Sequence, residues 1–254
     1  MIKIVFGVIF FCLAYFWFAF NNSSSESIMS ARALTSVIQA ARGKHSATVI
    51  FIHGLGDSGN GWAPATASIA PLLPHVKFVL PNAPNQPVTL NNGMAMPSWY
   101  DIYSLEAIDR EEDEKGMLAS SRSINSLIQK EIDAGIPANR IVLAGFSQGS
   151  AMSLLTGLTT EYKIAGIVAL SGYLPLRNTI FSMVADKKVP IFMGHGTADP
   201  VVQFQFGQMS SEQLQAKGYN VEFHAYPGMA HSCCDEELRH MAKFLQTVIP
   251  SEES

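Results

Sequence analysis

Two kinds of segment alternate along most of the chain, one almost continuously apolar and the other with apolar and polar residues mixed. Nearly continuous apolar runs, such as 47–53 and 76–80, are typical of strands that are buried on both faces of a sheet. Amphipathic segments such as 117–133 lie between these runs and are typical of helices. The order predicts a mostly parallel central sheet flanked by helices on both faces. The predicted strands are 47–53, 76–80, 140–144, 164–171, 189–195 and 219–226, and the predicted helices are 30–41, 62–73, 117–133, 151–158, 204–217 and 235–248.

Residues 81–116 do not fit this alternation. The segment begins rich in proline and asparagine, has an apolar middle that includes Trp99 and Tyr100, and ends in an acidic cluster at 109–114. Long connections in compact domains are more often functional than not. The apolar middle therefore has two interpretations: it lines a binding groove, or it forms an irregular loop that buried aromatic rings hold in place. The acidic cluster is expected to be a solvated surface.

The first residues form an apolar segment of a different kind. Residues 4–20 are an unbroken apolar run that, at about 1.5 Å per helical residue, nearly spans a hydrocarbon core. Three interpretations remain open: a membrane anchor, a signal peptide, or an optional extension ahead of a start at Met29. A signal peptide is disfavoured because the run is long and the exit FAFNNSS lacks a small-x-small cleavage site. We therefore divide the chain into an apolar segment with its linker, 1–28, and one α/β domain, 29–254.

Composition narrows the class of protein. The chain has 254 residues, of which 15% are charged, and a formal net charge of -4. This length suits one large domain, and the absence of a Lys/Arg cluster argues against nucleic acid as a partner. The three cysteines, Cys12, Cys233 and Cys234, offer neither a disulfide framework nor metal-ligand spacing, which fits a reducing compartment. A cysteine nucleophile at 233 or 234 is disfavoured because no second base lies beside it.

The hexapeptide GFSQGS places Ser147 between a predicted strand and a predicted helix. A G-x-S-x-G motif in this position forms a sharp turn that exposes the serine hydroxyl, and its glycines avoid clashes because they have no Cβ. The amino end of the following helix favours developing negative charge. We therefore predict that Ser147 is a nucleophile; the alternative is a tight turn with an incidental serine.

Chain order selects the partners of this serine, because α/β-hydrolases place the acid and then the histidine after the nucleophile. His231 lies on a loop between the last predicted strand and the last helix, whereas the other later histidines lie in or at the end of strands or within a helix. Asp199 follows a predicted strand in HGTADPVV, whereas Asp186 and Asp235 violate the order. We predict Asp199 as the acid and His231 as the base, with a turn residue and a helix-capping neighbour as the respective alternatives.

The glycine-rich turn HGLGDSG, 53–59, follows the first predicted strand of the alternating region. In this fold the oxyanion hole takes one backbone N–H from such a turn and one from the residue after the nucleophile. We expect these donors to be Leu55 and Gln148. No metal and no cofactor is required by this set of residues.

Six blocks of the sequence resemble, in order, those of the acyl-protein thioesterases, which belong to the phospholipase/carboxylesterase family of α/β-hydrolases. The blocks are HGLGDSGNGW, PNAPNQPVTLNNGMAMPSWYD, GFSQGSAMS, LSGYLPL, HGTADPVV and MAHSCCDEE, and the resemblance covers about residues 45–250. It implies an α/β-hydrolase fold without a large cap domain. It also implies hydrolysis of fatty-acyl thioesters on S-palmitoylated proteins, with activity toward lysophospholipids and small esters.

By position, the resemblance implies the same triad and oxyanion donors and suggests that Met96, Trp99 and Leu174 border the acyl channel. It implies a cytoplasmic protein, extending to the nucleus, whereas the run at 4–20 would attach the protein to a membrane if it is expressed. Ser150 departs from the family, which often has a second glycine there, and this change is expected to matter little.

Two alternatives to protein deacylation remain. The same triad would serve a lysophospholipase or a general carboxylesterase, because specificity depends on pocket shape. A catalytically silent α/β-hydrolase that acts as a receptor is the non-enzyme alternative, although such proteins usually lose a triad residue. The protein substrates, acyl-length preference, oligomeric state and start codon are not determined by the sequence.

Overall fold

The computed structural model describes residues 33–107, 110–184 and 188–251. The apolar run 4–20, its linker and the alternative start at Met29 lie outside these residues. Within them, no helix is both long enough and apolar enough to cross a membrane. The strands are β1 (Ser36–Gln39), β2 (Ala47–Ile52), β3 (Val76–Pro81), β4 (Asn85–Val88), β5 (Met94–Pro97), β6 (Ile141–Phe146), β7 (Gly166–Leu170), β8 (Ile191–Gly196) and β9 (Val221–Tyr226). The α-helices are α2 (Gly59–Ile69), α3 (Glu114–Asp133), α4 (Gln148–Thr159), α5 (Ile180–Met183), α6 (Phe204–Ala216) and α7 (Asp235–Val248).

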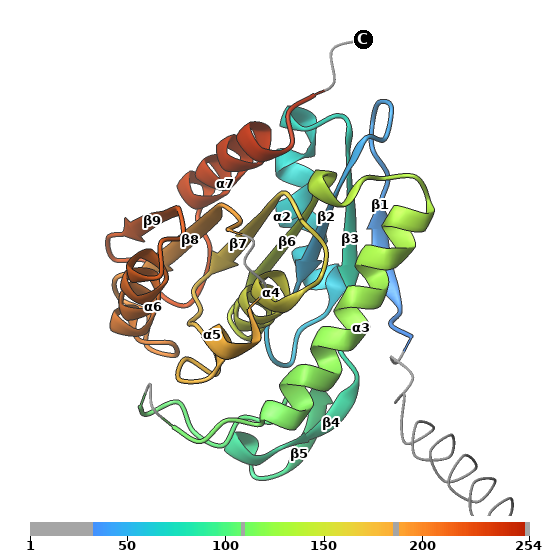
Figure 1. The fold of residues 1–254 in the computed structure, drawn as a ribbon. Coiled ribbons are helices and arrows are strands. Elements are labelled where there is room, and N and C mark those ends of the chain that lie inside the picture. Colours follow the sequence, from blue (N-terminus) through green and yellow to red (C-terminus); the bar gives the residue numbers. More distant parts are fainter. Residues whose placement is uncertain (1–32, 108–109, 185–187, 252–254) are drawn as a thin grey trace, which may run out of the picture. The chain divides into compact units, whose positions relative to one another are not determined.

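Seven strands form one sheet in the order β1-β3-β2-β6-β7-β8-β9. All neighbouring pairs are parallel except β1 and β3, which run antiparallel at one edge. Figure 1 shows this sheet with helices in front of it and behind it. The mostly parallel, helix-flanked sheet predicted from the apolar runs is therefore confirmed.

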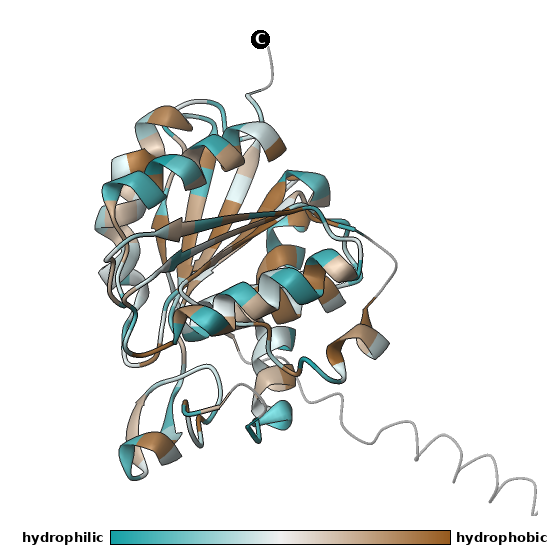
Figure 2. Cartoon of the chain, turned by 90° about the vertical axis from the view of Figure 1, so that its left-hand side faces the viewer, coloured by the Kyte–Doolittle hydropathy of each residue, from teal (hydrophilic) through white to brown (hydrophobic). Residues whose placement is uncertain are grey.

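The alternation of side chains along each strand divides the core into two layers. In β2, Ile50 and Ile52 pack with residues of α3, α4 and α6, whereas Val49 and Phe51 pack with residues of α2 and α7. Because both faces are covered, every residue of β2 is buried, which explains its continuous apolar sequence. Figure 2 shows the apolar strands between helices whose outer faces are largely hydrophilic.

The predicted helix over 30–41 is wrong for the residues that the structure describes. Residues Ser36–Gln39 instead form β1, which pairs with β3. The side-chain amide of Gln39 donates to the carbonyl oxygen of Ala63 in α2. Adding a strand to the open sheet edge satisfies backbone groups that an isolated short helix would leave exposed.

The segment 81–116 contains a small hairpin that was not predicted. Strands β4 and β5 form a separate antiparallel sheet, joined by a turn in which Asn92 and Gly93 have positive φ. Asp101 accepts hydrogen bonds from the backbone N–H and the hydroxyl of Thr89, and so ties the returning chain to the hairpin. The connection from β7 to β8 contains only the short α5, and no large cap is built from its described residues.

Candidate active site

Ser147 occupies a strained turn between β6 and α4. Its backbone has φ 55° and ψ -119°, an unusual conformation for a residue with a side chain. Two glycines make the turn compact: a Cβ at Gly145 would lie 2.2 Å from the Gly149 carbonyl oxygen, and a Cβ at Gly149 would lie 2.0 Å from the Ile52 carbonyl oxygen. The G-x-S-x-G spacing is thus required by the packing of α4 against β6 and β2.

Three residues predicted from chain order lie together at the carboxyl ends of the strands. Ser147 Oγ–H donates to His231 Nε2 at 2.9 Å, and His231 Nδ1–H donates to Asp199 Oδ2 at 2.7 Å. The His231 ring also packs against Phe146, with 4.7 Å between ring centroids. A neutral histidine held in this tautomer is able to take the serine proton.

Asp199 is held by its own loop as well as by His231. Its Oδ1 accepts the backbone N–H groups of Val201 and Val202, at 2.8 and 2.9 Å, and its side chain is fully buried. Burial favours the neutral acid, but hydrogen bonds from His195 and His231 outweigh this effect. The pKa of Asp199 therefore lies well below its usual range. Asp199 is therefore a carboxylate at neutral pH.

The predicted oxyanion donors lie on either side of the nucleophile. Gln148 is the first residue of α4, where backbone N–H groups lack acceptors within the helix. Leu55 lies in the turn after β2, and a Cβ at the preceding Gly54 would lie 3.3 Å from the Cβ of Ser147. Both Leu55 and Gln148 line the pocket that contains Ser147. The two residues therefore lie beside the nucleophile, and their role as oxyanion donors stays a prediction.

His53, which sequence reasoning did not single out, holds this turn through hydrogen bonds of both its ring nitrogens. Its Nδ1–H donates to the Gly54 carbonyl oxygen at 2.7 Å, and its Nε2 accepts the backbone N–H of Ala83 at 3.0 Å. Burial lowers the pKa of His53, which keeps the ring neutral and suited to both contacts. The histidine before a glycine-rich turn was the only sequence signal for this role.

The side chain of Gln148 is a second structural contact that sequence reasoning missed. Its amide oxygen accepts the backbone N–H of Trp99, and its amide nitrogen donates to Ser98 Oγ and to the Tyr100 carbonyl oxygen. The indole N–H of Trp99 donates to the His53 carbonyl oxygen at 2.8 Å. The nucleophile turn, the oxyanion turn and the segment after β5 are therefore joined by one hydrogen-bond network.

A pocket of about 340 Å³ opens beside Ser147 and is mainly apolar. Its lining comes from the oxyanion turn, the segment around β4 and β5, the nucleophile turn and the loops after β7, β8 and β9: Gly54, Leu55, Asp57, Leu90, Asn91, Tyr100, Ile102, Leu105, Phe146, Ser147, Gln148, Tyr173, Val201, Val202 and His231. An acyl chain attached to a carbonyl at Ser147 would have apolar walls to contact.

The three residues predicted to border the acyl channel, Met96, Trp99 and Leu174, are not among the residues that line this pocket, and their contact with an acyl chain stays a prediction. Trp99 is buried and uses its indole to hold the oxyanion turn, as described above. Leu174 is buried in the core, and its backbone N–H donates to Ser210 Oγ. Met96 lies on β5, where its sulfur accepts the side-chain amide of Asn91. Tyr100 and Tyr173, which are next to Trp99 and Leu174 in the sequence, do line the pocket.

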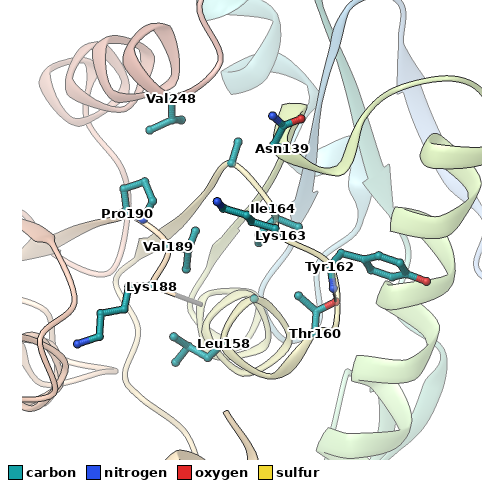
Figure 3. A pocket seen from close by; sticks show the side chains of 12 residues that line it. Asn139, Leu158, Thr160, Tyr162, Lys163, Ile164, Lys188, Val189, Pro190 and Val248 are labelled. Carbon is teal, nitrogen blue, oxygen red and sulfur yellow. Dashed lines mark hydrogen bonds between the residues drawn. The ribbon is translucent and has the colours of Figure 1, made fainter. Parts of the chain in front are cut away.

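A separate hollow of about 210 Å³ lies at the opposite end of the sheet, before β6, β7 and β8 (Figure 3). Lys163 and Lys188 are among its lining residues, but Lys188 Nζ donates to the Lys217 carbonyl oxygen. None of the triad residues reaches this hollow. Across the described residues, no group of three or more His, Cys, Asp and Glu side chains is arranged to hold a metal ion. Ser147 and His231 line the pocket described above and not this hollow.

Comparisons with known proteins show the family to which the chain belongs. The model of the Phospholipase/Carboxylesterase family matches residues 34–249. Acyl-protein thioesterase 1 of Neurospora crassa is 52% identical over 217 residues, covering 82% of this chain and 89% of that protein. The Cryptococcus neoformans protein of the same name is 49% identical over 222 residues, covering 81% and 93%. The crystal structure of Zea mays acyl-protein thioesterase 2 has a TM-score of 0.75 at 28% identity, covering 85% of this chain and 99% of that one. This chain therefore belongs to the phospholipase/carboxylesterase family of α/β-hydrolases.

Proposed function

We propose that this protein is a serine hydrolase that removes fatty-acyl groups from S-acylated cysteines of other proteins. The observation that carries the proposal is the hydrogen-bonded chain from Asp199 through His231 to Ser147, which ends at a mainly apolar pocket of about 340 Å³. The names of the relatives in Neurospora crassa and Cryptococcus neoformans support a thioester of an acylated protein as the substrate.

In the acylation step, Ser147 Oγ attacks the thioester carbonyl carbon while its proton passes to His231 Nε2. The carbonyl oxygen becomes an oxyanion that accepts hydrogen bonds from the backbone N–H groups of Leu55 and Gln148. Collapse of this tetrahedral intermediate breaks the carbon–sulfur bond, and the departing cysteine sulfur takes the proton from His231 Nε2, which leaves the histidine neutral for the next step. Because a thiolate is a good leaving group, protonation by His231 matters less here than it does for an amide.

In the deacylation step, water attacks the ester carbon of acyl-Ser147 and gives its proton to His231. The tetrahedral intermediate uses the same two amides, and its collapse returns the proton to Ser147 Oγ and releases the fatty acid. Asp199 stays ionised and stabilises the His231 imidazolium in both steps. Each turnover therefore consumes one water and regenerates the starting triad.

The absence of a large cap among the described residues supports a substrate whose lipid is still attached to a protein. The connection after β7 adds only α5, four residues long, to the strand end beside the site. A site that is open at its mouth leaves room for a polypeptide next to the scissile bond. A capped site would instead favour small free esters.

The test uses the full chain and an S-palmitoylated peptide, with Ser147→Ala as the blank and a fluorophosphonate probe to report the nucleophile. We expect thioester cleavage and probe labelling in the wild type, and loss of both in Ser147→Ala with an unchanged unfolding temperature. Comparable cleavage by Ser147→Ala would reject the assignment. Absence of both cleavage and labelling in the wild type would favour the silent receptor.

A lysophospholipase or general carboxylesterase is the second candidate, favoured by the family model itself. The same assay with lysophosphatidylcholine separates the two. A clear preference for the thioester in kcat/KM supports protein deacylation. A preference for the lysolipid keeps the mechanism and moves the biological role to lipid turnover.

We further propose that the enzyme acts in the cytoplasm, extending to the nucleus, and that residues 4–20 attach it to a membrane when they are expressed. The cysteine pattern, which offers no disulfide framework, supports the cytoplasmic location, and the apolar run supports the attachment to a membrane. Fractionation of cells expressing the full chain, or a chain starting at Met29, is the test. Salt-resistant pelleting of the full chain alone is expected; equal solubility of both chains would contradict the anchor.

A further inference from the structure

A second histidine, His195, contacts the same carboxylate oxygen of Asp199, Oδ2, that accepts from His231. His195 lies at the end of β8 and is 1% exposed. Its Nε2 lies 2.8 Å from the Val202 carbonyl oxygen and 3.4 Å from Asp199 Oδ2. Because a carbonyl oxygen only accepts, Nε2 must carry the hydrogen, which is then shared between the two oxygens.

The Nε2–H of His195 contacts both ends of the loop 199–202, at Asp199 and at Val202. Asp199 Oδ1 accepts from Val201 and Val202, while the Val202 carbonyl oxygen accepts from His195. Oδ2 is left between two imidazoles, that of His195 and that of His231 at 2.7 Å. Each carboxylate oxygen therefore has two donors nearby, and rotation of the carboxylate would break contacts on both sides.

The surroundings of His195 fix the ring itself. A Cβ at Gly207 in α6 would lie 2.3 Å from His195 Nδ1, so α6 approaches the ring at a position that has no side chain. The Phe204 ring meets the imidazole edge-on at 5.9 Å between centroids. This packing holds Nε2 toward the aspartate loop and Nδ1 toward α6.

We propose that His195 is a positioning residue for the triad: its Nε2–H holds the loop 199–202 and shares Asp199 Oδ2 with His231. The inference rests on the proposed hydrolase mechanism but not on which acyl substrate is used. Removing this donor leaves Oδ2 a stronger acceptor for His231 Nδ1–H while freeing the carboxylate to rotate. The expected signature is a lower kcat together with an acid limb of the pH–rate profile that moves to higher pH.

The test compares His195→Gln, which keeps an N–H donor at a similar distance from the backbone, with His195→Leu, which has none. With a p-nitrophenyl ester as substrate, we expect His195→Leu to lower kcat about 10- to 100-fold at nearly unchanged KM. We expect His195→Gln to recover most of this loss and to return the acid limb toward its wild-type position. Equal losses in both variants with an unmoved acid limb would show a packing role only and overturn the proposal.

Gly207→Ala gives an independent test because it leaves His195 chemically intact and displaces its ring. The same fall in kcat and the same shift of the acid limb are expected, together with a changed low-field proton resonance of His231 Nδ1–H. This variant also serves if His195→Leu does not fold. A wild-type profile in Gly207→Ala would contradict the proposal. Failure of the proposed function is distinguishable, since it would appear as wild-type ester cleavage without thioester cleavage.

Discussion

The hydroxyl of Ser150 occupies the space that a side chain at position 172 would need. A Cβ at Gly172 would lie 2.3 Å from Ser150 Oγ and 2.5 Å from Ser150 Cβ. Ser150 is fully buried on α4, and its hydroxyl has no hydrogen-bond partner among the described residues. The departure from the family at Ser150 is therefore accommodated by the absence of a side chain at Gly172.

The two positions are expected to be energetically coupled. Gly172→Ala should destabilise the protein by about 1 to 3 kcal/mol, because the added methyl group overpacks a closed site. Ser150→Gly/Gly172→Ala should recover much of this loss, whereas Ser150→Ala/Gly172→Ala should not, since the Cβ of residue 150 remains. Urea unfolding of the two double-mutant cycles provides the measurement. Additive effects in the Ser150→Gly cycle would show that the two residues do not share this space.

Asp199→Asn should lower kcat by about 10,000-fold with little change in KM, by analogy with the same change in other serine hydrolases. The asparagine amide would no longer select the His231 tautomer whose Nε2 accepts from Ser147. Steady-state kinetics with a small ester provides the measurement, and Asp235→Asn, an exposed change close to His231 in sequence, is the control. Activity of Asp199→Asn within tenfold of wild type would point to a different acid.

Glu237 should make the protein less stable as pH rises through neutrality. This carboxyl is fully buried on α7, neither oxygen has a hydrogen-bond partner in the described structure, and burial raises its pKa to about 8. Between about pH 4.5 and 8 the folded protein keeps a proton that the unfolded chain has lost, so the free energy of unfolding falls across this window. Above pH 8 this contribution has been lost and the curve levels off.

Glu237→Gln is expected to flatten that decline, because glutamine does not titrate. Since one pKa unit corresponds to about 1.4 kcal/mol, the effect should be readily measured by urea unfolding at several pH values. Glu236→Gln, an exposed neighbour on the same helix, should leave the decline in place. A parallel pH dependence in wild type and Glu237→Gln would show that Glu237 is not the source.

Tyr173 should set the longest acyl chain that fits the pocket. The hydroxyls of Tyr100 and Tyr173 are 2.8 Å apart, and both rings line the pocket beside Ser147 as well as a small cavity of about 10 Å³ behind it. Tyr173→Ala should join the two spaces and move the optimum of kcat/KM, measured on esters of increasing chain length, toward longer chains. Tyr173→Phe keeps the ring and should keep the optimum. Identical profiles for the alanine variant and wild type would place the end of the acyl site elsewhere.

The triad could be predicted from the sequence because its constraints are local. Each of Ser147, Asp199 and His231 follows a strand, and chain order in this fold leaves few candidates. The glycines around Ser147 also indicated the nucleophile turn, because close backbone contacts at Gly145 and Gly149 exclude any side chain there. Local pattern and tertiary packing agree at these positions.

The pocket lining could not be predicted in the same way. Tyr100 and Tyr173 are 73 residues apart and meet only after the sheet has formed, and nothing in either neighbourhood indicates the other. The error at β1 has a similar cause: Ser36–Gln39 is a strand because β3 offers an unpaired edge. Both the pocket lining and the strand β1 depend on contacts between residues that are distant in the sequence.

The hydrogen-bond network around Gln148 fixes the residues that follow β5 but does not include Met94 at the start of β5. Residues 98–100 are fixed to the nucleophile turn, whereas Met94 on the hairpin is 65% exposed and is not among the residues that line the pocket. Substitution of Met94 is therefore expected to leave the reacting groups undisturbed, whereas Leu90 and Asn91 in the turn of the hairpin line the pocket. An exposed methionine that belongs neither to the network nor to the pocket is a position where new surface contacts can evolve while the rate of bond cleavage is preserved.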